Sequence, residues 1–173
     1  MTRTTNGASQ KTELSVRHAI ATLAYRAAKP LRDAPADFSA FRPGEESRSA
    51  GEILAHLCDL LDWALSQARG AEKWRSSKPK AWTTDSERFF AAATSLDHYL
   101  GSGEKVHAPP EKLFQGAIAD ALTHVGQIAM LRRLAGSPIR GENYSQAKIE
   151  AGRTGADQNR PVREFDYGRR RVR

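Results

Sequence analysis

Residues 111–135 read EKLFQGAIADALTHVGQIAMLRRLA, and Gly136-Ser137-Pro138 follows directly. Apolar side chains recur along this stretch at helical spacing, and glycine followed by proline commonly ends a helix. The sequence therefore predicts a helix over about residues 111–135. Its apolar positions cover almost the whole circumference, which is typical of a helix buried among its neighbours. These positions are Leu113, Ile118, Ala121, Leu122, Val125, Ile128, Ala129, Leu131 and Leu134.

Three further helices are predicted upstream, over about residues 12–28, 49–68 and 85–101. The second has a clear start signal, because Ser49 is followed three residues later by Glu52, and together they form a capping box. Each helix has one apolar face at helical spacing. The faces comprise Val16, Ile20, Leu23 and Ala27; Ile53, Leu57, Leu60, Leu61 and Ala64; and Phe89, Ala93, Leu96 and Leu100.

Four helices of this length favour an all-α fold, namely a four-helix bundle with irregular termini. A chain of 173 residues has room for one domain with its own core. We expect residues 1–11 to be unstructured, residues 12–140 to form the bundle, and residues 141–173 to form an extended arginine-rich tail. No stretch approaches the roughly 20 apolar residues of a membrane span, and no secretory signal is visible. A cytoplasmic protein that does not enter membranes is therefore expected.

The net charge of +7 is concentrated at the C-terminal end. Residues 160–173 contain six arginines against two acidic residues, a net +4, which leaves +3 for the rest of the chain. A basic tail attracts phosphates without sequence specificity. Association with nucleic acid is therefore expected only non-specifically and through this tail, and a solvated terminus is the plainer interpretation.

Projection of the helices at about 100° per residue separates the five histidines, and three of them have no case beyond surface or loop positions. His56 lies at the margin of an apolar face, whereas Asp120, His124 and Gln127 share one side of the last helix. Asp120 and His124 are four residues apart, so their side chains converge. A carboxylate buried among aliphatic side chains needs a cation or a proton to neutralise it.

This pattern predicts a divalent metal ion bound inside the bundle by His56, Asp120 and His124. Two histidines and a carboxylate leave coordination positions open for water or substrate, as in catalytic sites. The alternative is an internal Asp–His ion pair without a metal. Cys58 has no partner for a disulfide and projects roughly 160° away from His56, so we expect it to be structural.

Three stretches, SAGEILAHL (49–57), DALTHVGQI (120–128) and LRRLAG (131–136), resemble the DinB/YfiT-like superfamily. The resemblance spans about residues 12–140. It implies an up-down-down-up helix bundle, often a homodimer, that binds zinc, nickel or another divalent metal through three histidines. Known members include thiol-dependent transferases and isomerases.

Carried onto this chain, the resemblance places His56 and His124 at two ligand positions. The third is usually histidine and here is Asp120. A harder oxygen donor shifts the preference away from soft-site metals, so iron or manganese become candidates beside zinc and nickel. The same departure is compatible with metal binding that has weakened or been lost.

Glu142 and Tyr144 follow the last helix closely, and they are candidate acid/base or substrate-positioning residues at the open end of the site. Ordinary loop residues are the alternative. The leading functional expectation is a metal-dependent hydrolase or thiol-dependent transferase that acts on an unknown small-molecule substrate. The alternatives are a non-catalytic, metal-binding or stress-related dimeric bundle and a protein that associates weakly with nucleic acid through its tail.

Overall fold

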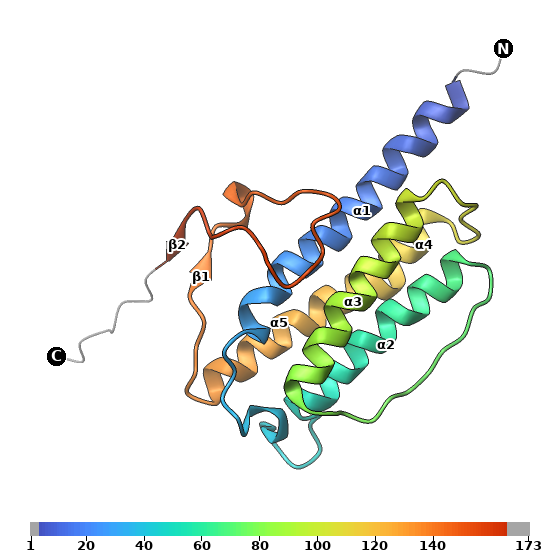
Figure 1. The fold of residues 1–173 in the computed structure, drawn as a ribbon. Helices are drawn as coiled ribbons and strands as arrows, with labels where there is room; N and C mark the ends of the chain where they lie inside the picture. Colours follow the sequence, from blue (N-terminus) through green and yellow to red (C-terminus); the bar gives the residue numbers. More distant parts are fainter. Residues whose placement is uncertain (1–3, 166–173) are drawn as a thin grey trace.

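The computed structural model describes residues 4–165, and in the first helix it describes side chains from Ser15 onward. In this part of the chain, four long helical segments lie side by side (Figure 1). They are α1 (Thr4–Leu31), α2 (Ala50–Ala68), α3 (Trp82–Gly101) and a segment that combines α4 (Pro110–Leu113), a π-helical turn (Phe114–Ile118) and α5 (Ala119–Leu134). The predicted all-α class is confirmed.

The helices run in two directions: α1 and α5 point one way, and α2 and α3 point the other way (Figure 1). Trp82, at the start of α3, donates its indole N–H to the carbonyl of Leu31 at the end of α1, at 2.9 Å. Asp59, in the middle of α2, and Arg88, in the first half of α3, form an ion pair. Because α2 and α3 are parallel, residues 69–81 must return along the whole length of the helices.

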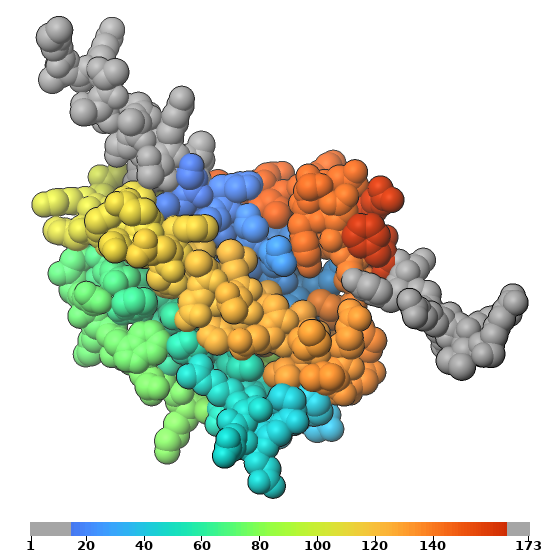
Figure 2. All heavy atoms as spheres, turned by 180° about the vertical axis from the view of Figure 1, so that it is seen from behind, coloured from blue at the N-terminus to red at the C-terminus, as the bar shows by residue number. Residues whose placement is uncertain are grey.

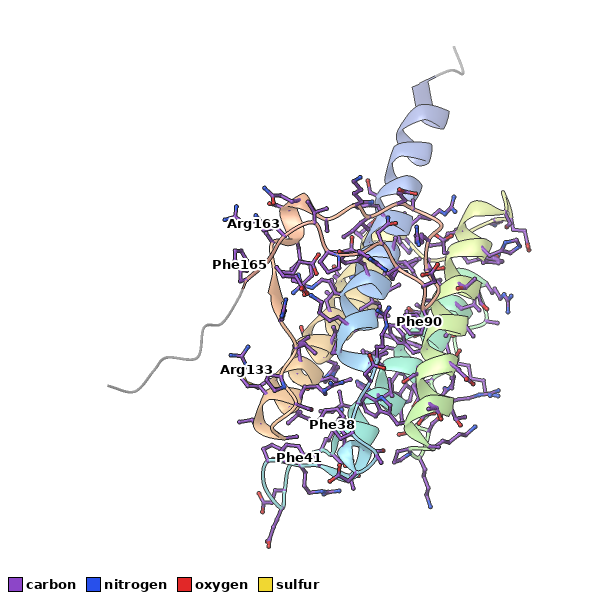
Figure 3. The ribbon with its side chains drawn as sticks, turned by 60° about the vertical axis from the view of Figure 1, so that its left-hand side comes forward. Phe38, Phe41, Phe90, Arg133, Arg163 and Phe165 are labelled. Carbon is purple, nitrogen blue, oxygen red and sulfur yellow. The ribbon has the colours of Figure 1, made fainter. Side chains whose placement is uncertain are left out.

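The hydrophobic core lies between the helices, and the predicted apolar faces of the first three helices are all buried in it. Phe38, in the short helical turn Phe38–Ala40, closes one end of the core (Figure 3). Its ring meets the indole of Trp82 edge-on, with 5.0 Å between the ring centroids. This contact explains why α3 begins at residue 82 rather than at the predicted residue 85.

The first helix extends beyond its predicted range of 12–28 at both ends. Residues 4–11 are helical, so the prediction that they are unstructured is wrong, because a packed helix propagates outward at one hydrogen bond per residue. At the other end the helix passes Pro30, and the buried guanidinium of Arg132 donates to the carbonyls of Pro30, Arg32 and Asp33. Arg132 therefore satisfies carbonyls that the helix end leaves without partners.

The prediction that the last helix is buried all round is wrong. The helix α5 packs against α1 and α2, and its remaining side forms part of the surface, shown in yellow to orange in Figure 2. Met130 and Leu134 are each 57% exposed, although Leu134 was expected in the core. Apolar residues around a helix do not bury it when only two neighbouring helices cover it.

Residues 141–165 fold back beside α1 instead of extending as a tail (Figure 1). Strands β1 (Gly141–Glu142) and β2 (Glu164–Phe165) pair antiparallel, and a helical turn covers Tyr144–Gln146. Thr154 is buried and shares a 3.0 Å hydrogen bond with Thr94 of α3. Residues 166–173, which carry four of the six arginines of residues 160–173, lie outside the described part. Among the described helices, none has the length and apolar character of a membrane span.

Candidate metal centre

The three predicted ligands meet at the seam between α2 and α5. The capping box fixes the start of α2, because Ser49 Oγ accepts from the Glu52 amide at 3.2 Å and the Ser49 amide donates to Glu52 Oε2 at 2.7 Å. His56 follows two turns later and faces α5. Asp120 and His124 lie one turn apart on α5 and face α2, so the predicted convergence of the three side chains is confirmed.

Two of the distances between ligand atoms are close to those between neighbouring ligands of one cation. His56 Nε2 lies 3.5 Å from Asp120 Oδ2, and His124 Nε2 lies 3.4 Å from Asp120 Oδ1. Both exceed the roughly 2.7–3.2 Å of an ordinary N–H···O hydrogen bond. Two ligands about 2.1 Å from a tetrahedral ion are separated by about 3.4 Å. All three ligand atoms lie within 4.8 Å of one another, so this group can hold a metal ion.

A fourth side chain orients one imidazole. His124 Nδ1 lies 2.7 Å from Gln127 Oε1. With the amide oxygen as acceptor, Nδ1 donates the hydrogen bond, and Nε2 is the ring nitrogen that faces Asp120. Metal-bound histidines characteristically donate their second ring N–H to such an acceptor. The contact therefore fixes the orientation of the His124 ring in a way that a metal ligand would need.

The pKa of His56 is held below its usual range. Burial of the imidazole is the main cause, and the neighbouring His124 and the positive charge of Arg48 add to it, against the opposing effect of Asp120. The ring is therefore neutral at pH 7. A neutral imidazole has a lone pair for a metal ion, and it forms no ion pair with Asp120.

The carboxylate of Asp120 is not buried. Its side chain is 47% exposed, compared with 20% for His56 and 13% for His124. The expectation of a negative charge deep among aliphatic side chains is therefore wrong, because Asp120 lies at the solvent-exposed edge of the seam between α2 and α5. Because the charge of Asp120 is exposed, it does not require a neutralising cation. The case for a metal site therefore depends on the convergence of the three donor atoms. Its exposure leaves coordination positions accessible to water or substrate.

Two tryptophans that the sequence patterns did not single out stand beside His56. The Trp74 ring meets the imidazole edge-on at a centroid distance of 5.7 Å, and Trp63 meets Trp74 at 5.8 Å. The indole N–H of Trp63 donates to Glu72 at 3.0 Å, which holds the connection after α2 in place. Trp74 is 47% exposed despite its size. The only sequence signal for this pair of tryptophans was Trp74, a large aromatic residue in an otherwise polar connection.

On its other side, His124 borders a surface cavity of about 670 Å³ between residues 43–48 and α5. The cavity is lined mainly by apolar side chains, and Arg48 and Gly126 also line it. Periodicity could not reveal it, because residues 43–48 precede α2 and meet α5 only in the folded chain.

Glu142 and Tyr144 lie elsewhere. Glu142 is buried, accepts a hydrogen bond from the Tyr25 hydroxyl at 2.5 Å and pairs with Lys29 at 3.2 Å. The Tyr144 ring packs edge-on against Tyr25 and lies 4.2 Å below the guanidinium of Arg26. All these partners belong to α1, because residues 141–165 fold back along that helix. The structure therefore does not bring either residue to the three candidate metal ligands.

Cys58 is structural, as predicted. It is buried, and its thiol lies 3.2 Å from the carbonyl oxygen of Asp85. Burial raises the pKa of the thiol to about 12, so it remains protonated and unreactive at neutral pH. The three histidines set aside in the sequence, His18, His98 and His107, are exposed.

The centre thus combines two imidazoles, one exposed carboxylate, an amide that hydrogen-bonds one of the rings, and an adjoining cavity. Such a donor set suits several divalent metals and leaves room for a substrate. Comparisons with protein-family models, with curated proteins and with solved structures give no match. The assignment of the centre therefore rests on the geometry of this chain.

Proposed function

We propose that this chain is a DinB-like divalent-metal-binding protein in which His56, Asp120 and His124 hold one ion. One observation carries the proposal: the three donor atoms converge within 4.8 Å from two different helices. The two imidazole nitrogens favour zinc or nickel, and the carboxylate oxygen makes iron or manganese the alternatives.

The membership of the DinB/YfiT-like superfamily is part of this proposal. The opposite directions of α1 and α5 against α2 and α3 agree with an up-down-down-up bundle. The positions of His56 and His124 on facing helices agree with the ligand positions that the resemblance implies. A homodimer in the cytoplasm is the state that we propose with it.

The proposed activity is metal-dependent hydrolysis or thiol-dependent group transfer. A divalent ion lowers the pKa of a bound water or thiol and polarises an oxygen of the substrate. In this chain, Gln127 would keep His124 in the tautomer that can ligate, while the exposed side of Asp120 would leave access for substrate. The adjoining cavity would hold the rest of the substrate molecule.

A non-catalytic metal-binding bundle is the second candidate, and one observation favours it. The two residues expected to act as acid and base, Glu142 and Tyr144, are held against α1. Any proton transfer in a reaction would then depend on the metal ligands themselves or on water.

The experiment is a metal-binding measurement on the full chain. The protein is stripped with a chelator and dialysed against Zn²⁺ or Ni²⁺, and its metal content is determined by elemental analysis. We expect one ion per chain, and its loss in His124→Ala. His98→Ala is the matched control, because His98 is an exposed histidine of α3. Retention of the ion by His124→Ala, or its loss in His98→Ala, would refute the proposed site.

A further inference from the structure

We propose that the cavity beside His124, called here the α5 groove, binds a substrate that has an apolar chain and a terminal carboxylate. The inference deepens the proposed function, on which it rests for the reaction but not for the binding itself. The volume of about 670 Å³ is that of a small-molecule site. The groove is defined by Pro43, Arg48, Ile53, Gly126, Met130 and Leu134, with His124 at one end.

The floor of the α5 groove is apolar and open. Met130 and Leu134 lie one helical turn apart, each 57% exposed, and Ile53 and Leu131 lie beside them. At a rise of about 1.5 Å per residue, the helix from His124 to Leu134 covers about 15 Å. Large exposed aliphatic side chains gathered along one cavity are typical of a surface that binds an apolar partner.

One positively charged side chain, that of Arg48, lines this mainly apolar cavity. Arg48 is exposed, and it forms no hydrogen bond or ion pair with any residue that the structure describes. The nearby carboxylate of Glu52 is already engaged by the Ser49 amide and by Arg42. Arg48 and His124 line the same cavity, so the guanidinium and one of the candidate metal ligands border a common space. An anionic head group would meet it there, because a guanidinium pairs well with a carboxylate.

Gly126 supplies an independent observation. A glycine in the middle of a helix weakens that helix relative to alanine. Close packing usually explains such a residue, but a Cβ at position 126 would meet no described atom within 4 Å. Gly126 lines the α5 groove, and within the described chain its missing side chain serves no close contact with another element. Local stability given up in this way is typical of functional positions.

The charge of Arg48 selects among possible occupants. An apolar cation would be repelled at the same end of the groove that Arg48 makes favourable for an anion. A second copy of the chain could cover the apolar floor, but an apolar contact alone would supply no anion for the Arg48 guanidinium. A carboxylate with an apolar chain satisfies both features, with the head group at Arg48 in the cavity that His124 also lines.

The test uses decanoate, below its micelle concentration, titrated calorimetrically into the metal-free full chain. Acetate and decyltrimethylammonium supply the head group without the chain and the chain with the opposite charge. We expect decanoate to bind at least about tenfold more tightly than either, and Arg48→Gln to weaken it about tenfold. Arg42→Gln is the matched control, because Arg42 precedes the same helix but pairs with Glu52.

Gly126→Leu should abolish decanoate binding, because its side chain fills the groove without a clash at Cβ. Met130→Asp gives a second readout at an exposed position, and its added negative charge should also weaken binding. Equal binding of decyltrimethylammonium, or unchanged affinity in Arg48→Gln, would overturn the inference. So would sedimentation showing a dimer that Gly126→Leu dissociates, since the groove would then be an interface between copies.

The two proposals fail separately in this design. Decanoate is measured without metal, so its binding would persist if the chain held no metal ion. Conversely, if the chain binds one metal ion per molecule but does not bind decanoate, the metal centre is supported and the α5 groove is refuted as a carboxylate site.

Discussion

Replacement of Gln127 by alanine tests whether the hydrogen bond to His124 serves a metal ligand. The amide oxygen lies 2.7 Å from Nδ1 of His124, and Gln127 is itself exposed. Its loss should change the folded state little, because exposed side chains outside caps and cores contribute little to stability. It should, however, free the imidazole to rotate and to change tautomer. Loss of such an orienting partner lowers metal affinity about 10–100-fold.

The magnitude follows from the linkage between binding and folding. Zn²⁺ at about 100 times its dissociation constant stabilises the native chain by about 2.7 kcal/mol. For a chain of this size, that raises the melting temperature by about 5–10 °C. At the same Zn²⁺ concentration, a tenfold weaker Gln127→Ala variant gains about 1.4 kcal/mol, and a hundredfold weaker one gains about 0.4 kcal/mol.

The assay is thermal unfolding, followed by circular dichroism, with and without Zn²⁺. Gln115→Ala is the control, since Gln115 is an exposed glutamine of the preceding π-helical turn. Gln127→Glu should restore most of the zinc-dependent shift, because a carboxylate also accepts from Nδ1. Equal zinc-dependent shifts in the wild type and Gln127→Ala would refute the orienting role. A lowered melting temperature without metal would point to a purely structural role.

Four further outcomes are expected. Arg132→Met should lower the free energy of unfolding by about 3 kcal/mol or more in urea titrations, because several buried carbonyls lose their donor. Burial works against ionisation of Asp59, but donation from Ser77 and Arg88 outweighs it and lowers the pKa of Asp59. Its folded pKa is therefore below its unfolded one, so this stabilisation is complete at neutral pH and is lost as the pH falls through the folded value. Unfolding experiments should accordingly show less acid sensitivity in Asp59→Asn. Asp120→His should retain one ion and shift competition dialysis from Mn²⁺ toward Ni²⁺ and Zn²⁺. Chelation should leave the far-ultraviolet circular dichroism spectrum unchanged, because the core contains no metal ligand, and an unfolded metal-free chain would contradict this.

Local sequence patterns predicted the parts of the structure that local interactions decide. The capping box at Ser49 is present because its two hydrogen bonds join residues three apart. Asp120 and His124 converge because one helical turn separates them. The apolar faces of the first three helices are buried because each face has a single direction in which it can pack.

Features that depend on the number of neighbours or on the path of the chain were not predictable in this way. A helical projection shows which residues share a side, but not whether another helix covers that side. Asp120 was therefore expected in the interior and is half exposed. Glu142 is close to the last helix in sequence, but the course of residues 141–165 takes it to Tyr25 and Lys29.

The exposure of Asp120 changes what the centre is suited for. A metal site that replaces a hydrophobic core is saturated by protein ligands and is needed for folding. Here none of the three candidate ligands belongs to the hydrophobic core. The Asp120 carboxylate borders solvent, and His124 lines the α5 groove. An ion held there would stabilise the fold only by its binding energy and would keep positions for exchangeable ligands. A catalytic or ligand-exchanging centre needs such open positions, and an exposed aspartate is compatible with them.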